Sequence, residues 1–240
     1  MFSQVCDNSV MATTHLADFP APHMAVDVAV LTIDPAGQMC LLLVRRHGDK
    51  DGTWALPGRF VRERQRLSEA VAVTLEEKCG LSPTDLHGRS PRQLHLFDDP
   101  ERDDRGWVMS MAHLLALPHE SLAPALAASS DLQLAPIVDG HVRVTGQREL
   151  PYGQDAIVDY AVQEMRRLYA TAPDPEGLIS DKEFTLAQLH EVHTAVVASD
   201  WQIDTFRRHM IPLLDETGRR ATGGVGRPAA LFRLRLSASQ

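Results

Sequence analysis

The residues best suited to chemistry lie between positions 54 and 81, where the sequence WALPGRFVRERQRLSEAVAVTLEEKCGL brings acidic and basic side chains into one short segment. Carboxylates on one helix face can hold Mg²⁺, which neutralises charge and orients water when a pyrophosphate is hydrolysed. Arginine side chains can instead grip phosphate oxygens through paired hydrogen bonds. The segment therefore offers residue types for cleaving a diphosphate compound or for binding one.

A helix must position these side chains. Leu67, Val71 and Leu75 recur every four residues, and this spacing places them on one helix face. Gly80 suits the left-handed conformation that ends many helices. The Trp-Ala-Leu-Pro-Gly sequence that starts at Trp54 predicts a turn leading into the helix.

This loop and helix resemble the Nudix box, a pattern of Gly, five residues, Glu, seven residues and then Arg-Glu-apolar-x-Glu-Glu-x-Gly-apolar. When Gly80 and Leu81 are aligned with the end of the pattern, Leu75 and Glu77 also match it. The remaining positions depart from the pattern and are Arg59 for the first Gly, Gln65 for the first Glu, Val73 and Thr74 for the Arg-Glu pair, and Lys78 for the last Glu. The resemblance implies a Nudix fold in which most metal-binding carboxylates are replaced.

The replaced acids bear directly on catalysis. In the pattern, carboxylates at positions 74, 77 and 78 would hold Mg²⁺, and only Glu77 is left. Lys78 adds an ammonium group, which would repel a metal ion by roughly a few kcal/mol at contact distance. Glu69 and Glu76 lie nearby but outside the ligand positions, and solvated helix charges are their simpler interpretation. We therefore expect a domain that binds a nucleotide diphosphate compound without cleaving it, with no catalytic residue, metal or cofactor.

Arginines elsewhere in this part of the chain are candidates for holding phosphate. Two of them end an expected strand before the box, and two lie in the Asp/Arg-rich turn before the apolar run at 107–117. The residues predicted to bind the ligand are Arg45, Arg46, Trp54, Arg59, Arg102 and Arg105. Solvated strand-end charges are an equally good explanation of the arginines on the strands and turn, and Trp54 is more often a core residue than a stacking partner for adenine. Arg59 either plugs the pocket or clasps an anion, and both interpretations stay open.

The surrounding segments predict a sheet with helices packed on it. Apolar, β-branched runs at 26–33 and 39–44 flank the turn sequence Asp-Pro-Ala-Gly-Gln and predict a hairpin. The run at 107–117 predicts a strand buried on both faces, 141–145 a shorter strand, and 154–170 an amphipathic helix. An Asp/Arg-rich turn before a long apolar strand is similar to Nudix proteins of the ADP-ribose class.

The C-terminal part begins with two predicted helices. Thr185 and Gln188 form one capping box, and Ser199 and Gln202 form a second one after a short turn. The second helix would bury Ile203, Phe206 and Met210 and leave its basic residues outside. Two short helices joined in this way indicate a helix-turn-helix.

The residues that follow predict a wing. Positions 217–236 read as a glycine-rich loop that carries arginines, followed by a strand of alternating character. A winged helix places its second helix in the major groove of DNA, and its wing contacts the backbone or minor groove, where negative potential favours arginine.

Residues 25–236 as a whole resemble the Nudix-related transcriptional regulators of the NrtR family, in which a Nudix-like domain precedes a winged helix. The shared motifs are the turn from Trp54 to Gly58 with Phe60 and Val61, the run FTLAQLHEV at 184–192, Phe206 with Arg207 and Arg208, and Gly226 to Pro228 before Phe232 and Arg233. The resemblance implies a homodimeric repressor of NAD metabolism genes that binds a palindromic operator in double-stranded DNA. It also implies that the Nudix-like domain senses ADP-ribose or a related NAD-derived nucleotide.

The resemblance assigns DNA contacts to the second helix and the wing. The residues expected to bind DNA are Thr205, Arg207, Arg208, Arg219, Arg220 and Arg227. The family usually has Arg-Asn before the Phe of the second helix, where this chain has Asp204 and Thr205. Asp204 would repel phosphate if it faced DNA, so the operator sequence stays open.

Bulk properties set the expected organisation. The 240 residues, 44% hydrophobic and 23% charged, are typical of a globular protein of one or two domains. We expect an α+β protein with a tail at 1–24, a Nudix-type α/β/α sandwich with a mixed sheet at 25–170, a linker at 171–183 and a winged helix-turn-helix domain at 184–240.

The net charge is −8, yet residues 201–240 carry +4, so only this end suits a polyanion. Three unpaired cysteines and the lack of a long apolar run predict a cytoplasmic protein with no membrane partner.

Two other function classes remain open. The first is a Mg²⁺-dependent Nudix ADP-ribose pyrophosphatase with an accessory C-terminal module. The second is a structural or partner-binding module, which predicts no binding to DNA at moderate salt. Hydrolysis of ADP-ribose separates the first from a repressor, and a DNA-binding assay separates the second.

Overall fold

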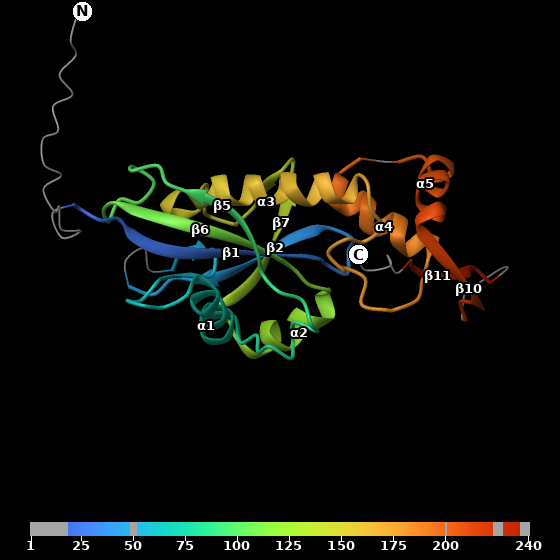
Figure 1. The fold of residues 1–240 in the computed structure, drawn as a ribbon, viewed down its shortest axis with the longest axis horizontal. Helices are drawn as coiled ribbons and strands as arrows, with labels where there is room; N and C mark the ends of the chain where they lie inside the picture. Colours follow the sequence, from blue (N-terminus) through green and yellow to red (C-terminus); the bar gives the residue numbers. More distant parts are fainter. Residues whose placement is uncertain (1–18, 49–51, 200, 223–227, 236–240) are drawn as a thin grey trace, which may run out of the picture.

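The computed structural model describes residues 19–48, 52–199, 201–222 and 228–235. Its N-terminal part is a mixed sheet that runs in the order β5-β6-β1-β2-β7-β8 (Figure 1). The short strand β3 pairs with β2, and the short strand β4 pairs with β1. β1 pairs in parallel with β6 and antiparallel with β2. The strands are β1 His23–Ile33, β2 Met39–Arg45, β3 Trp54–Ala55, β4 Gly58–Phe60, β5 Arg92–Phe97, β6 Val108–Ala116, β7 Leu132–Val138 and β8 His141–Val142.

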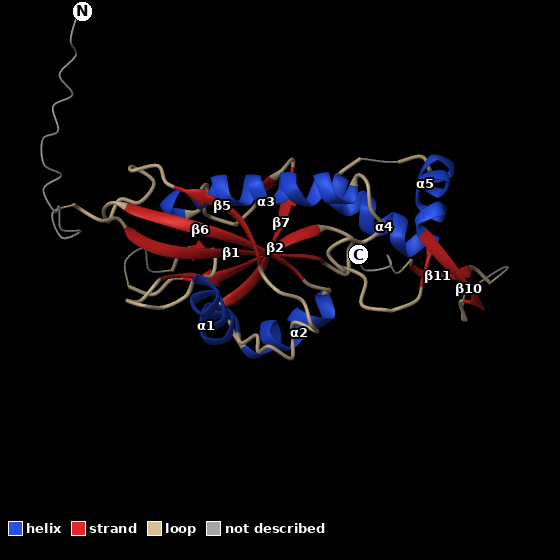
Figure 2. Ribbon diagram, in the orientation of Figure 1, coloured by secondary structure: helices blue, strands red, loops and turns tan. Residues whose placement is uncertain are grey.

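Helices cover both faces of this sheet because its central strands are apolar on both faces. In β1, Val28 and Val30 face one side, and Ala29 and Leu31 face the other. α1 (Leu67–Cys79) and α2 (His119–Ala128) pack on the first side, and α3 (Gln154–Tyr169) packs on the second (Figure 2). The expected α/β/α sandwich with a mixed sheet is confirmed.

The box helix forms as its spacing predicts. α1 covers Leu67–Cys79, and Gly80 ends it in the left-handed conformation with φ of 64°. Leu75 and Cys79 are buried against the sheet. The box therefore lies on a rigid element, where Glu76 and Glu77 are exposed and Thr74 is buried.

The C-terminal part is a winged helix. α4 (Leu186–Val197) and α5 (Ile203–Met210) pack on a sheet of β9 (Phe184–Thr185), β10 (Leu214–Arg220) and β11 (Ala230–Leu234), which run in the order β10-β11-β9. Phe184, Leu189, Phe206, Met210, Leu214 and Phe232 form its core. Thr185 caps α4 through the capping box with Gln188 that the sequence predicts.

Several predicted boundaries are wrong. Ser199 is not the cap of α5, which begins after Gln202 without a side-chain cap. α4 ends at Ala198 in the left-handed conformation, and the Ser199 carbonyl accepts a hydrogen bond from the amide of Trp201, so the chain reverses before α5 starts. The apolar strand begins at Val108, since Trp107 is 42% exposed.

The segment at 171–183 is anchored to the N-terminal part. The buried carboxylate of Asp174 accepts hydrogen bonds from the Tyr169 hydroxyl at 2.6 Å and from the amides of Leu178 and Ile179 at 2.7 and 3.0 Å. Arg92 on β5 pairs with Glu176 at 3.1 Å. These contacts fix where the winged helix begins relative to the sheet.

Candidate functional site

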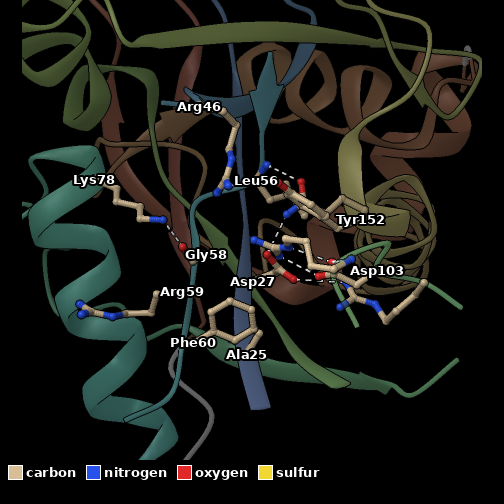
Figure 3. Close-up of a pocket in the computed structure, with 13 residues that line it drawn as sticks. Ala25, Asp27, Arg46, Leu56, Gly58, Arg59, Phe60, Lys78, Asp103 and Tyr152 are labelled. Carbon is tan, nitrogen blue, oxygen red and sulfur yellow. Dashed lines mark hydrogen bonds and ion pairs between the residues drawn. The ribbon is translucent and has the colours of Figure 1, made fainter. Parts of the chain in front are cut away.

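A cavity of about 250 Å³ opens between the box helix, β1 and the start of α3 (Figure 3). Lys78 and Arg59 lie on the side of α1, and Tyr152 and Asp103 lie on the opposite side. Its wall carries five cationic side chains and two carboxylates. The lining residues are Ala25, Asp27, Arg46, Leu56, Gly58, Arg59, Phe60, Lys78, Arg102, Asp103, Arg105, Tyr152 and Gln154.

Asp27 holds the floor of this cavity together. It is 6% exposed and accepts hydrogen bonds from the Ser110 hydroxyl at 2.6 Å and the Gln154 side-chain amide at 2.8 Å. Arg102 pairs with the same carboxylate at 3.5 Å. A Cβ at Gly58 would lie 2.2 Å from Asp27 Oδ1, so only glycine allows this approach of β4 to β1. Asp27 thus joins β1, β6 and α3 at one point.

Tyr152 forms the wall opposite α1. Its ring centroid lies 3.8 Å from the Arg105 guanidinium and 5.1 Å from that of Arg46, and Arg46 Nη2 donates to its hydroxyl at 3.0 Å. Tyr152 has φ of 61°, a strained conformation that turns its ring toward the cavity just before α3. Asp103 holds Arg105 through two hydrogen bonds of 2.8 and 2.7 Å. Burial raises the pKa of Asp103, but Arg105 outweighs this and the net pKa is below its usual value.

The degenerate box positions do not fit a magnesium ion. Glu77 is paired with Arg59 at 3.1 Å, and the Lys78 ammonium donates to the Gly58 carbonyl. Thr74 is fully buried and its hydroxyl donates to the Ala70 carbonyl at 2.7 Å within the helix. Within the described residues, no cluster of three or more His, Cys, Asp or Glu side chains could hold a metal. At the three ligand positions the chain has a buried hydroxyl, a carboxylate paired with arginine and an ammonium group, whereas Mg²⁺ prefers carboxylates.

The remaining degenerate positions, Gln65 and Val73, take no part in the cavity. Gln65 accepts a hydrogen bond from the Arg62 amide at 3.0 Å in the loop before α1. Val73 is half-buried on the helix.

The structure brings together four of the predicted ligand residues, namely Arg46, Arg59, Arg102 and Arg105. Arg45 and Trp54 lie outside the cavity. Arg45 is exposed at the end of β2, and Trp54 packs against the core beneath α3. Arg45 and Arg46 are separated because neighbouring residues of an extended chain point to opposite sides.

Sequence reasoning missed several residues of the cavity. Asp27 gave a signal, since it is a lone carboxylate within an apolar strand. Nothing in the sequence marks Phe60 as a pocket residue. In the structure it lines the rim of the cavity and is 43% exposed. Asp103, Tyr152 and Gln154 were also missed, and Lys78 was assigned only as a degenerate box position.

The predicted DNA-binding residues lie on two elements of the winged helix. Arg207 and Arg208 are exposed on α5, and Thr205 is half-buried beside them. Arg219 on β10 pairs with Glu183 at 3.0 Å, and Arg220 donates to the Pro228 carbonyl at 3.1 Å. Arg227 falls outside the described residues. Among the described residues, no helix is long and apolar enough to cross a membrane.

Comparisons with known proteins agree with this architecture. The Nudix domain model matches residues 23–134, and the model of the NrtR DNA-binding winged helix domain matches residues 180–234. The ADPR responsive transcriptional repressor NtrR of Acinetobacter baylyi is 24% identical over 234 residues, which is 96% of this chain and 89% of that protein. An ADP-ribose pyrophosphatase of Methanocaldococcus jannaschii is 34% identical over 88 residues, which is 37% of this chain and 49% of that protein.

One solved structure matches this chain over both of its domains. Shewanella oneidensis NrtR, crystallised with a 27mer DNA, is 27% identical, with a TM-score of 0.71 over 88% of this chain and 93% of that one. The two domain models follow each other in the same order as the sandwich and the winged helix described above. The chain therefore belongs to the NrtR family, the Nudix-related transcriptional regulators.

Proposed function

We propose that this protein is a transcriptional repressor of NAD metabolism genes that binds a palindromic operator as a homodimer in the cytoplasm. Its domain at 25–170 senses ADP-ribose or a related NAD-derived nucleotide and does not hydrolyse it. The domain at 184–240 binds DNA. Its relatives support this assignment, because one is named as ADPR responsive and another was crystallised with DNA.

The observation that carries the proposal is the path of α3. Its 16 residues make a rod of roughly 24 Å. Gln154 at its start binds Asp27 and the Leu56 amide in the cavity, both at 2.8 Å. Tyr169 at its end packs edge-on against His193 of α4, with ring centroids 5.1 Å apart.

From α4 the contacts continue to the helix that would read DNA. The His193 ring lies 5.0 Å from the Phe206 ring of α5. A ligand that displaces the start of α3 would therefore act on α5 through packed side chains. Such a ligand changes DNA affinity only if it binds the two placements of the winged helix with different affinity. In a dimer these placements set the half-site spacing, roughly 34 Å for one helical turn.

The pairing of Glu77 with Arg59 supports binding without hydrolysis. A carboxylate already held by a guanidinium at 3.1 Å is a poor metal ligand. Incubation with ADP-ribose and Mg²⁺, followed by chromatography for AMP, should show no sustained turnover. Turnover that Glu77→Gln abolishes would instead establish an ADP-ribose pyrophosphatase.

Gel retardation tests the repressor directly. DNA from upstream of the protein's own gene and of NAD biosynthesis genes should be shifted, and ADP-ribose should weaken the shift. DNA of matched length and composition without an inverted repeat is the control. Equal retardation of both DNAs, or of neither, would contradict operator recognition.

A further inference from the structure

The Nudix box of this chain carries Lys78 where the pattern has a metal-binding Glu, and Arg59 where it has its first Gly. Three cations line this side of the cavity: Lys78 from α1, Arg59 from β4 and Arg46 from just after β2 (Figure 3). We call these three residues the cationic cluster. The two carboxylates that line the cavity form their ion pairs with other cations, Asp27 with Arg102 and Asp103 with Arg105.

The cluster is held in place by the fold. The Arg59 side chain is only 13% exposed and is fixed by Glu77. Lys78 is fixed by its hydrogen bond to the Gly58 carbonyl. Fixed donors need no reorganisation when an anion arrives, so little entropy is lost on binding.

An unsatisfied donor indicates that the cluster can receive an anion. Arg59 Nε is buried and has no hydrogen-bond partner among the described residues, and a buried donor without a partner is costly. A bound phosphate would accept from Arg59 and offset the mutual repulsion of the cations.

We propose that the cationic cluster replaces the Nudix metal, so that the diphosphate of the effector binds directly to Lys78, Arg59 and Arg46 without a divalent ion. This inference rests on the proposed function, since it takes a nucleotide diphosphate as the effector. Arginine grips phosphate oxygens in bidentate fashion, and lysine supplies a compact charge. Neither side chain can hold and activate a water as Mg²⁺ does, which agrees with binding without cleavage.

The decisive measurement is calorimetric titration of the full-length protein with ADP-ribose, once in EDTA and once in Mg²⁺. Binding in EDTA that Mg²⁺ leaves unchanged or weakens is the expected result. If ADP-ribose binds only in Mg²⁺, the cluster does not replace the metal, and the proposed effector still stands. If it binds in neither buffer, the proposed effector itself is wrong.

Variants localise the effect. Lys78→Gln should weaken binding in EDTA at least tenfold, because Lys78 supplies a full charge at the diphosphate. The control is Lys182→Gln, which removes an exposed lysine outside the cavity and should leave affinity unchanged. Inorganic pyrophosphate serves as a second probe and should compete with ADP-ribose for the wild type but not for Lys78→Gln. Equal affinity of both variants in EDTA would overturn the inference, and circular dichroism verifies that both are folded.

Discussion

The rings of Tyr169 and His193 meet edge-on where α3 ends on α4, at an interplanar angle of 65°. The Tyr169 hydroxyl is held by Asp174 at 2.6 Å, and the other side of His193 packs on Phe206. This contact joins the part of the chain that carries the cavity to the part that carries α5.

Removing the Tyr169 ring should uncouple the two sites. Tyr169→Leu should bind operator DNA nearly as well as the wild type, but ADP-ribose should change its DNA affinity by less, because the edge-on contact is lost. Coupling in such systems is typically about 5- to 150-fold, and the variant should approach onefold. Fluorescence anisotropy with labelled operator measures the ratio of the DNA affinities without and with ADP-ribose. The matched control is Tyr169→Phe, which keeps the ring. If ADP-ribose changes the DNA affinity of Tyr169→Leu and Tyr169→Phe equally, the two sites are not coupled through this contact.

Acid should destabilise the protein through His193. Burial lowers the pKa of His193 from 6.5 to about 4, so the unfolded chain binds a proton more readily than the folded one. The free energy of unfolding should therefore fall as the pH drops from 6.5 to about 4, by up to about 3 kcal/mol from this group. Urea unfolding at several pH values across this range measures the slope of the free energy of unfolding against pH. His193→Gln should flatten it, whereas replacing the exposed His87 should not.

The arginines of β10 should contact the DNA backbone. Replacing Arg219 and Arg220 by Ala should weaken binding to all sequences alike, because phosphate contacts carry no sequence information. The slope of log affinity against log salt should fall by roughly one to two, close to one for each lost contact. The control replaces Arg143 and Arg148, two exposed arginines outside the winged helix. An unchanged slope for the first pair would exclude their phosphate role.

Phe60 should support the base of the effector at the rim of the cavity. Its ring is 43% exposed and lies 5.1 Å from the Arg105 guanidinium. A base stacked on an aromatic side chain gains about 1–3 kcal/mol. Phe60→Leu should thus weaken ADP-ribose roughly 5- to 100-fold and leave inorganic pyrophosphate unaffected. Calorimetry with both probes tests this. An equal loss of affinity for ADP-ribose and for pyrophosphate would show that the ring does not stack on the base.

The sequence predicted what depends on local pattern. The four-residue spacing of Leu67, Val71 and Leu75 located α1, and Gly80 ended it, because helix periodicity and the left-handed cap are properties of neighbouring residues. The capping box at Thr185 likewise located α4. The second capping box failed at Ser199, because the reversal between the helices uses its carbonyl instead.

The cavity could be predicted only in part, since it is assembled from distant segments. Asp27 and Gln154 are 127 positions apart and meet only when α3 packs on the sheet. Tyr152 reaches the cavity because its φ is positive, and the neighbouring residues do not predict this conformation. Arg45 and Arg46 look alike in sequence, and the alternation of an extended chain brings only Arg46 into the cavity.

α4 belongs to two cores at once. Leu189 lies in the core of the winged helix, and Val196, two turns later, lies in the core between α3 and the sheet. Neither core is complete without this helix, so the two parts cannot melt independently. A thermogram of the intact chain should show a single cooperative peak, and excising either part at the segment before α4 would leave an apolar surface prone to aggregation.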